Sequence, residues 1–193
     1  MGRLSKPLLG LLGVLGVLGM ASRLRPGSSP SAPAPAPASR STLRDLAVRL
    51  GLQEFERVNE PGAPEADPAD YWAVAAQQPL STAELARLDW CGGFYLWVLK
   101  VAGIAPANVF WRFDGTGIAS AKLRLTNSPE PGDLAYFKRN QHHALIEAVD
   151  GDTIRIINGN GGGKGITRSS VSRRDVAAFY SIDPLLAGRD LVA

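Results

Sequence analysis

The chain has few of the residues that bind metals or form disulfides: its 193 residues include one cysteine and two histidines. A single cysteine cannot form an internal disulfide bond. The cysteine and the histidines also lack the spacing of a zinc site, so we expect no metal and no other cofactor. The one cysteine, Cys91, is therefore either a small buried apolar residue or a reactive thiol.

Acidic residues are absent from the first 40 positions, which hold five Lys and Arg residues. The formal net charge of +3 for the whole chain therefore becomes −2 for residues 41–193. A slightly acidic segment lacks the basic stripe that nucleic-acid binding requires. We expect no nucleic-acid partner.

Residues 1–25 have the pattern of a signal peptide or an N-terminal membrane anchor. Arg3 and Lys6 precede an apolar run over residues 7–21, which ends in small residues around Ala21. The run is rich in glycine and shorter than the about 20 apolar residues of a spanning helix, which favours a cleaved leader over an anchor. In both cases we expect export to the periplasm, the cell envelope or the outside.

Residues 26–40 are rich in alternating Ala and Pro. This composition favours an extended polyproline II linker, which cannot build a core. We therefore expect one folded domain over residues 41–193, acting as a monomer.

The stretch that contains Cys91 has the spacing of a buried helix. Apolar residues recur at three- and four-residue steps from Cys91, Asp89 is a candidate N-cap, and Gly103 is a candidate C-terminal stop. Cys91 then lies in the first turn, where unpaired N–H groups and the helix dipole favour a thiolate. On position alone, the structural and the chemical interpretation of Cys91 stay equally open.

The hydrophobic pattern changes from helical to alternating after residue 132. We expect helices at residues 41–51, 71–76, 81–88 and 118–125, and strands at residues 133–139, 142–149, 153–157 and 176–181. Helices followed by a small antiparallel sheet predict an α+β fold.

The hairpin after the histidines has two candidate registers. A three-residue loop over residues 150–152 pairs Ile146 with Ile156 and Ala148 with Ile154, which collects the apolar side chains on one face. A two-residue turn at residues 150–151 mixes apolar and charged side chains on both faces. We expect the three-residue loop, because a buried face fixes the register.

In that register His142 lies on the apolar face, which we expect to pack on the cysteine helix. Asn160 is opposite His142, Asn158 is one diagonal step away, and His143 points outward. A base that deprotonates a thiol and a third group that orients the base are the parts of an activated nucleophile. The candidate catalytic set is Cys91, His142 and either Asn158 or Asn160, with His143 as the alternative base. A core histidine and turn asparagines are the alternative interpretation.

These motifs resemble the CHAP-type cysteine amidohydrolases and peptidases, which are papain-like enzymes that cut peptidoglycan. The resemblance rests on DWCGGFYLWVLKVAG at residues 89–103, PGDLAYF at residues 131–137, the run from His142 to Gly151, and NGN at residues 158–160. The family histidine then matches His142. Two residues depart from the family pattern, because a second histidine replaces Val or Ile at position 143 and Asn158 stands where many members have Glu.

The resemblance implies a papain-like fold and an exported hydrolase that cleaves amide bonds of cell-wall peptidoglycan. Two alternatives stay open. One is a catalytically inactive wall-binding module on the same fold, and the other is a thiol acyltransferase that acts on a non-wall substrate.

Overall fold

The computed structural model describes residues 39–162 and 165–187. The predicted leader and nearly all of the predicted linker lie outside these residues. The helices are α1 (Arg40–Asn59), α2 (Pro68–Ala75), α3 (Thr82–Leu85), α4 (Cys91–Val101), α5 (Gly117–Ser120) and α6 (Asp183–Leu186), with 3₁₀ turns η1 (Lys138–Asn140) and η2 (Arg173–Asp175). The strands are β1 (Arg124–Thr126), β2 (Leu134–Phe137), β3 (His142–Asp150), β4 (Thr153–Gly161), β5 (Gly165–Ser172) and β6 (Ala178–Ser181). None of these helices is long and apolar enough to cross a membrane.

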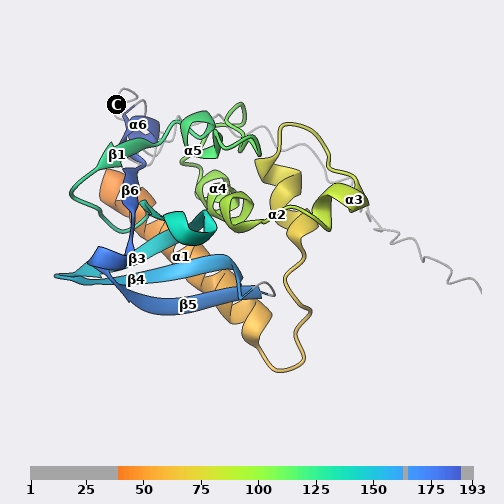
Figure 1. Ribbon diagram of the computed structural model, residues 1–193, viewed down its shortest axis with the longest axis horizontal. Coiled ribbons are helices and arrows are strands. Elements are labelled where there is room, and N and C mark those ends of the chain that lie inside the picture. The colour runs from red at the N-terminus through yellow and green to blue at the C-terminus, as the bar shows by residue number, and fades with distance from the viewer. Residues whose placement is uncertain (1–38, 163–164, 188–193) are drawn as a thin grey trace, which may run out of the picture. The chain divides into compact units, whose positions relative to one another are not determined.

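The strands form one antiparallel six-stranded sheet in the order β1-β6-β2-β3-β4-β5. The helices α1 and α4 pack on β3 and β4, and α2 packs on α4 (Figure 1). The described residues therefore have the predicted α+β architecture. The sequence pattern does not predict β1 or β5. The helix expected over residues 118–125 ends at Ser120, and β1 begins at Arg124. Half of β5 is exposed, and its sequence is mostly polar.

The helix α4 forms at the predicted position, but its N-cap is Trp90 rather than Asp89. Most of its side chains are buried, which agrees with the nearly continuous apolar sequence. It ends where Gly103 takes a φ of 70° and donates its N–H to the carbonyl of Lys100. A glycine suits this left-handed position, so the predicted stop is confirmed.

The helix α1 is longer than predicted and begins one residue earlier. Its N-cap is Ser39, not Ser41 or Thr42, and it continues through Gly51 to Asn59. Gly51 does not end the helix, because it lies where the helix approaches the sheet. A Cβ there would be 2.7 Å from Leu145 Cδ2 and 3.2 Å from Ile157 Cδ1. The glycine thus permits close packing of α1 on β3 and β4.

The sheet is apolar on both faces. Leu134, Leu145 and Ile157 belong to the core that the helices complete. Their sequence neighbours Ala144 and Ile156 belong to a second cluster on the opposite face. The full second cluster is Ala135, Ala144, Ile146, Ile154, Ile156, Val176 and Phe179. Ala144, Ile146, Ile154 and Ile156 share one face as predicted, but α4 packs on the other. Ala148 leaves the predicted set, because it pairs with Arg155 rather than with Ile154.

The turn between β3 and β4 differs from the prediction. Asp150 pairs with Thr153, so the turn has the two central residues Gly151 and Asp152 rather than three. A bulge at Glu147 then shifts the pairing by one residue, and Ile146 pairs with Ile156 as predicted. The register is therefore wrong at the turn and correct beside the histidines.

The bulged residue Glu147 is held in place by ion pairs with arginines of β4 and β5. Glu147 is 8% exposed, and both of its carboxylate oxygens accept hydrogen bonds of 2.6 Å from Arg168 on β5. Arg155 on β4 approaches the same carboxylate at 3.3 Å. The bidentate pair ties the bulged residue to the strand beyond β4.

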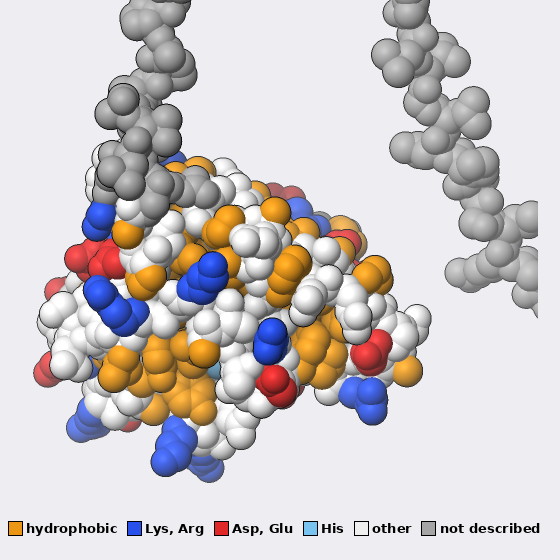
Figure 2. Space-filling view, turned by 90° about the horizontal axis from the view of Figure 1, so that it is seen from above, with side chains coloured by type: hydrophobic (Ala, Val, Ile, Leu, Met, Phe, Trp, Pro, Cys, Tyr) orange, Lys and Arg blue, Asp and Glu red, His pale blue; other side chains and the backbone are white. Residues whose placement is uncertain are grey.

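The described part of the face in Figure 2 mixes hydrophobic patches with scattered charges. Lys and Arg side chains lie singly on it, and acidic side chains lie between them. This face therefore lacks a continuous basic stripe.

A buried arginine joins the first helix to the sheet. The Arg44 guanidinium, from α1, donates to Asp133 Oδ1 at 2.7 Å and to Asp183 Oδ1 at 2.8 Å. Asp133 is 1% exposed and also accepts the backbone N–H of Ile182. The aspartate of the PGD motif thus holds together α1, the segment before β2 and the C-terminal segment.

We predict that Arg44→Ala lowers the free energy of unfolding by about 3–5 kcal/mol, because it leaves the Asp133 carboxylate buried without its cation. Chemical denaturation of the described domain measures the loss. Arg49→Ala, at an exposed position of the same helix, is the matched control and should change the stability by less than about 0.5 kcal/mol. Equal losses in the two variants would contradict the proposed role of Arg44.

Candidate functional site

Cys91 and one histidine meet where α4 begins and β3 begins. The distance between Cys91 Sγ and His143 Nδ1 is 3.4 Å. Cys91 is 4% exposed, and His143 is half-buried. The prediction that His142 faces Cys91 is wrong, and the alternative base His143 takes that place. The reason is that both faces of the sheet are buried. Side chains alternate along β3, so His143 lies on the same face as Leu145, and α4 packs on that face.

The start of α4 carries no side-chain cap. The N–H groups of its first turn therefore have no side-chain acceptor, which leaves them available at the thiol. The backbone of His143, and after it the backbone N–H groups of Gly92 and Cys91, act on the sulfur in the direction that lowers its pKa. This agrees with the expectation for a cysteine in a first helical turn.

Burial nevertheless exceeds this effect. Desolvation raises the pKa of the Cys91 thiol, and the nearby Asp89 carboxylate raises it further. Desolvation also lowers the pKa of His143 to about 4, with a smaller contribution from the adjacent His142. Both groups are therefore neutral near pH 7, so the thiol can donate to Nδ1, and the expected resting thiolate is not favoured.

Two aromatic side chains enclose the His143 ring. Trp111 contacts it edge to face with a centroid distance of 4.9 Å, and Tyr136, its partner on β2, lies at 5.4 Å. The Trp111 indole occupies a slot between two glycines. A Cβ would be 2.2 Å from the indole at Gly92 and 2.4 Å from it at Gly117. The absence of both side chains therefore allows Trp111 to reach the histidine.

The predicted third residue does not orient the histidine that meets the thiol. Asn158 Oδ1 lies 2.9 Å from His142 Nε2, and Asn158 Nδ2 donates to Ser169 Oγ at 3.3 Å. His142 also packs against Phe137, beside the second cluster. The predicted contact between His142 and Asn158 thus forms, but on the face of the sheet opposite Cys91.

Asn160 is hydrogen-bonded to the segment just before Cys91. Its Nδ2 donates to Asp89 Oδ1 at 2.9 Å, two residues before Cys91. Its φ of 58° is in the left-handed region, which Asn tolerates better than most residues. Asn160 therefore joins the end of β4 to the segment that enters α4, and it does not contact either histidine.

The site opens into a polar pocket of about 430 Å³ that contains Cys91 and His143. Its other lining residues are Arg87, Leu88, Asp89, Gly92, Trp111, Arg112, Phe113, Gly115, Gly117, Ile118, Tyr136, Gln141 and Tyr180. Among the described residues, no group of three or more His, Cys, Asp or Glu side chains could hold a metal ion.

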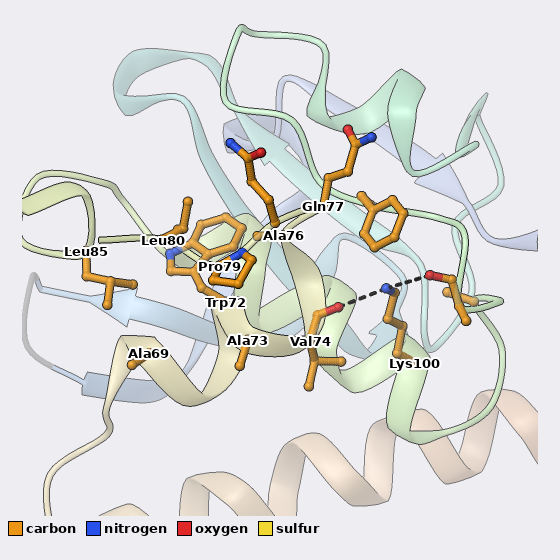
Figure 3. A pocket seen from close by; sticks show the side chains of 14 residues that line it. Ala69, Trp72, Ala73, Val74, Ala76, Gln77, Pro79, Leu80, Leu85 and Lys100 are labelled. Carbon is orange, nitrogen blue, oxygen red and sulfur yellow. Dashed lines mark hydrogen bonds between the residues drawn. The ribbon is translucent and has the colours of Figure 1, made fainter. Parts of the chain in front are cut away.

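A larger, mostly apolar cavity of about 730 Å³ lies elsewhere, beside α2 (Figure 3). Trp72, Pro79, Leu80 and Leu85 line it, and Lys100 closes one side by donating to the carbonyl of Val74 at 2.8 Å. Neither Cys91 nor His143 lines this cavity. The smaller pocket is therefore the candidate site, because it contains both Cys91 and His143.

Sequence reasoning misses the aromatic wall of the site. Trp111 and Gly117 come from residues 104–132, which have little periodicity. In the sequence, the glycine pair Gly92 and Gly93 after the cysteine indicates a close contact. Nothing in the sequence indicates that Gly92 and Gly117 contact the same indole. Tyr136 lies inside the predicted strand, and its alternation with Ala135 places it on one face or the other without saying which.

Comparisons with known proteins add little. No family model and no curated protein matches the chain. A crystal structure of a protein called Ly7917 is 20% identical, and the match covers 60% of this chain and 60% of that chain with a TM-score of 0.34. The match therefore spans about three fifths of the length of Ly7917, and a likeness of this size carries no argument about fold or function.

We predict that Gly117→Ala displaces Trp111 and loosens the packing around His143. Overpacking of this kind costs about 1–3 kcal/mol, and a better hydrated imidazole should have a pKa that rises from about 4 towards its ordinary value of 6.5. Thermal unfolding and NMR titration of the two histidines measure both effects. The control Ala119→Ser changes an exposed position of the same short helix and should alter neither. An unchanged His143 titration in Gly117→Ala would show that the indole does not shield the ring.

Proposed function

We propose that residues 41–193 form a papain-like cysteine hydrolase that cleaves amide bonds of cell-wall peptidoglycan, with Cys91 as nucleophile and His143 as general base. The observation that carries the proposal is the 3.4 Å approach of Cys91 Sγ to His143 Nδ1 inside a pocket. A thiol at a helix start beside a strand-borne imidazole is the arrangement that nucleophilic acyl transfer needs.

Two further points support the class of enzyme. The cysteine helix packs on an antiparallel sheet in which the PGD segment directly precedes β2 and the two histidines begin β3. The motifs around Cys91 and Pro131 resemble those of the CHAP-type enzymes, and the choice of peptidoglycan as substrate rests on that resemblance. The leader-like residues 1–25 support export to the cell envelope or beyond it.

In the first step, the thiol proton moves from Cys91 Sγ to His143 Nδ1 as the sulfur attacks the amide carbonyl carbon. An S–C bond forms, and the carbonyl oxygen becomes an oxyanion. The N–H groups in the first turn of α4, which have no side-chain cap, are the proposed donors for that oxyanion. One such donor contributes about 3 kcal/mol in comparable sites.

In the second step, the oxyanion collapses and the C–N bond breaks. The His143 imidazolium gives its Nδ1 proton to the leaving nitrogen, and an amine departs from a thioester on Cys91. Water then attacks the thioester carbonyl, and its proton passes through Nδ1 to Cys91 Sγ. The products are a carboxylic acid and the free thiol, so the enzyme returns to its starting state.

One observation favours the inactive wall-binding module as a second candidate. Among residues 39–162 and 165–187, no side chain makes the polar contact to His143 that would orient the ring as Asn158 holds His142. Packing against Trp111 and Tyr136 has to fix the ring instead. Hydrolysis by the wild-type protein distinguishes the two candidates.

We predict that the two histidines differ sharply in activity assays. His143→Gln should lose about 10²–10⁴-fold in kcat, because it removes the base beside the thiol. His142→Gln should keep most of the activity, because residue 142 lies on the opposite face. Release of soluble fragments from purified sacculi measures the rates, with Cys91→Ala as the zero. Loss in His142→Gln with survival in His143→Gln would reverse the assignment.

We also predict the pH dependence of the thiol. Because burial raises the pKa of Cys91, its thiolate fraction at pH 7 is below that of a free cysteine. Its alkylation by iodoacetamide should therefore rise about tenfold per pH unit from pH 7 to 9. N-acetylcysteine serves as the reference thiol. A rate that is already constant near pH 7 would indicate a resting thiolate–imidazolium pair and contradict the neutral pair.

A further inference from the structure

The pocket at Cys91 carries more positive than negative charge. Its charged lining residues are Arg87, Arg112 and Asp89. The two guanidinium groups belong to different segments, since Arg87 follows α3 and Arg112 follows the Trp111 slot. Both arginines line the pocket that contains Cys91.

Both guanidinium groups have donors to spare. Arg87 uses its Nε for the carbonyl of Ala83 at 3.1 Å, and its two terminal nitrogens have no hydrogen-bond acceptor in the described part of the chain. Arg112 is bonded there only through its backbone N–H, to Ser120 Oγ. Asp114, close to Arg112 in sequence, instead accepts the backbone N–H and the hydroxyl of Thr116. Within the described residues, Arg87 and Arg112 interact with Glu84 and Asp114 only electrostatically, without a close ion pair.

The one carboxylate of the pocket is already engaged. Asp89 Oδ1 accepts the hydrogen bond from Asn160, so Asp89 is held at the entry to α4. The imidazole adds no charge near pH 7, because burial keeps the pKa of His143 at about 4. The lining residues therefore carry one net positive charge, two guanidinium groups against the Asp89 carboxylate.

We propose that Arg87 and Arg112 bind a carboxylate of the substrate close to the scissile amide, so that the site selects acidic peptides over neutral ones. Arginine suits this task, because its planar group donates two parallel hydrogen bonds to a carboxylate and stays charged at any working pH. The inference rests on the proposed nucleophile Cys91, and it adds the chemical class of the substrate. The pocket volume of about 430 Å³ is in the range of small-ligand sites.

The test compares two alkylating reagents that differ in one group. Iodoacetate carries a carboxylate, whereas iodoacetamide carries a neutral amide of similar size, and both transfer a carbon to Cys91 Sγ with loss of iodide. The ratio of their rate constants at pH 8 measures the preference of the pocket for an anion without any need for hydrolysis.

Arg87→Gln and Arg112→Gln should each lower the iodoacetate to iodoacetamide ratio by about three- to tenfold, and the ratio for the native chain should fall with added salt. Arg49→Gln removes an exposed arginine of α1, outside the pocket, and should leave the ratio unchanged. An equal ratio in the native chain and in both pocket variants would overturn the proposal. So would a Cys91 that reacts with neither reagent, because the pocket would then admit no carboxylate.

Sacculi provide the second measurement. Carbodiimide and ammonia convert their free carboxylates to amides, and the native protein should release fragments from untreated sacculi about tenfold faster than from amidated ones. Arg87→Gln and Arg112→Gln should lose that preference. A reagent ratio that depends on both arginines, without hydrolysis of either kind of sacculus, would keep the carboxylate site and refute the wall hydrolase. Equal rates of hydrolysis for untreated and amidated sacculi would keep the wall hydrolase and refute the carboxylate site.

Discussion

The packing of α4 on the Leu145 and Ile157 face of the sheet is the contact on which the site depends. It buries Cys91 at the start of the helix and determines which side chains of β3 can contact the thiol. Because side chains alternate along a strand, Leu145 under the helix places His143 at the sulfur and sends His142 to the other face. The same packing therefore forms the core and brings Cys91 and His143 together.

The sequence pattern predicts four of the six strands and the cysteine helix, but it does not predict which face of the hairpin that helix covers. Cys91 at the start of a buried helix, the capped α3 and the pairing of Ile146 with Ile156 all follow from local pattern. The error came from an assumption that only one face of the hairpin is apolar. Leu145 and Ile157 make the second face apolar too, and alternation cannot tell which of two apolar faces a helix covers.

The remainder of the site depends on contacts between distant segments. Trp111 reaches His143 only because Gly92 and Gly117, which lie 25 residues apart, leave room for the same indole. No local rule pairs an aromatic residue with two such glycines. The same holds for Gly51, which resembles a helix stop in sequence and is a packing contact in three dimensions.

The bulge at Glu147 separates the tip of the hairpin from its base. Between the turn and Glu147, the turn sets which residues of β3 and β4 pair. On the other side of Glu147 the pairing is shifted by one residue, so that Leu145 pairs with Ile157. A hairpin without the bulge but with one more residue in its turn would present the same histidine to the thiol. The length of the turn can therefore vary in related chains while the face that meets Cys91 stays constant, provided that Glu147 and its partner Arg168 vary with it.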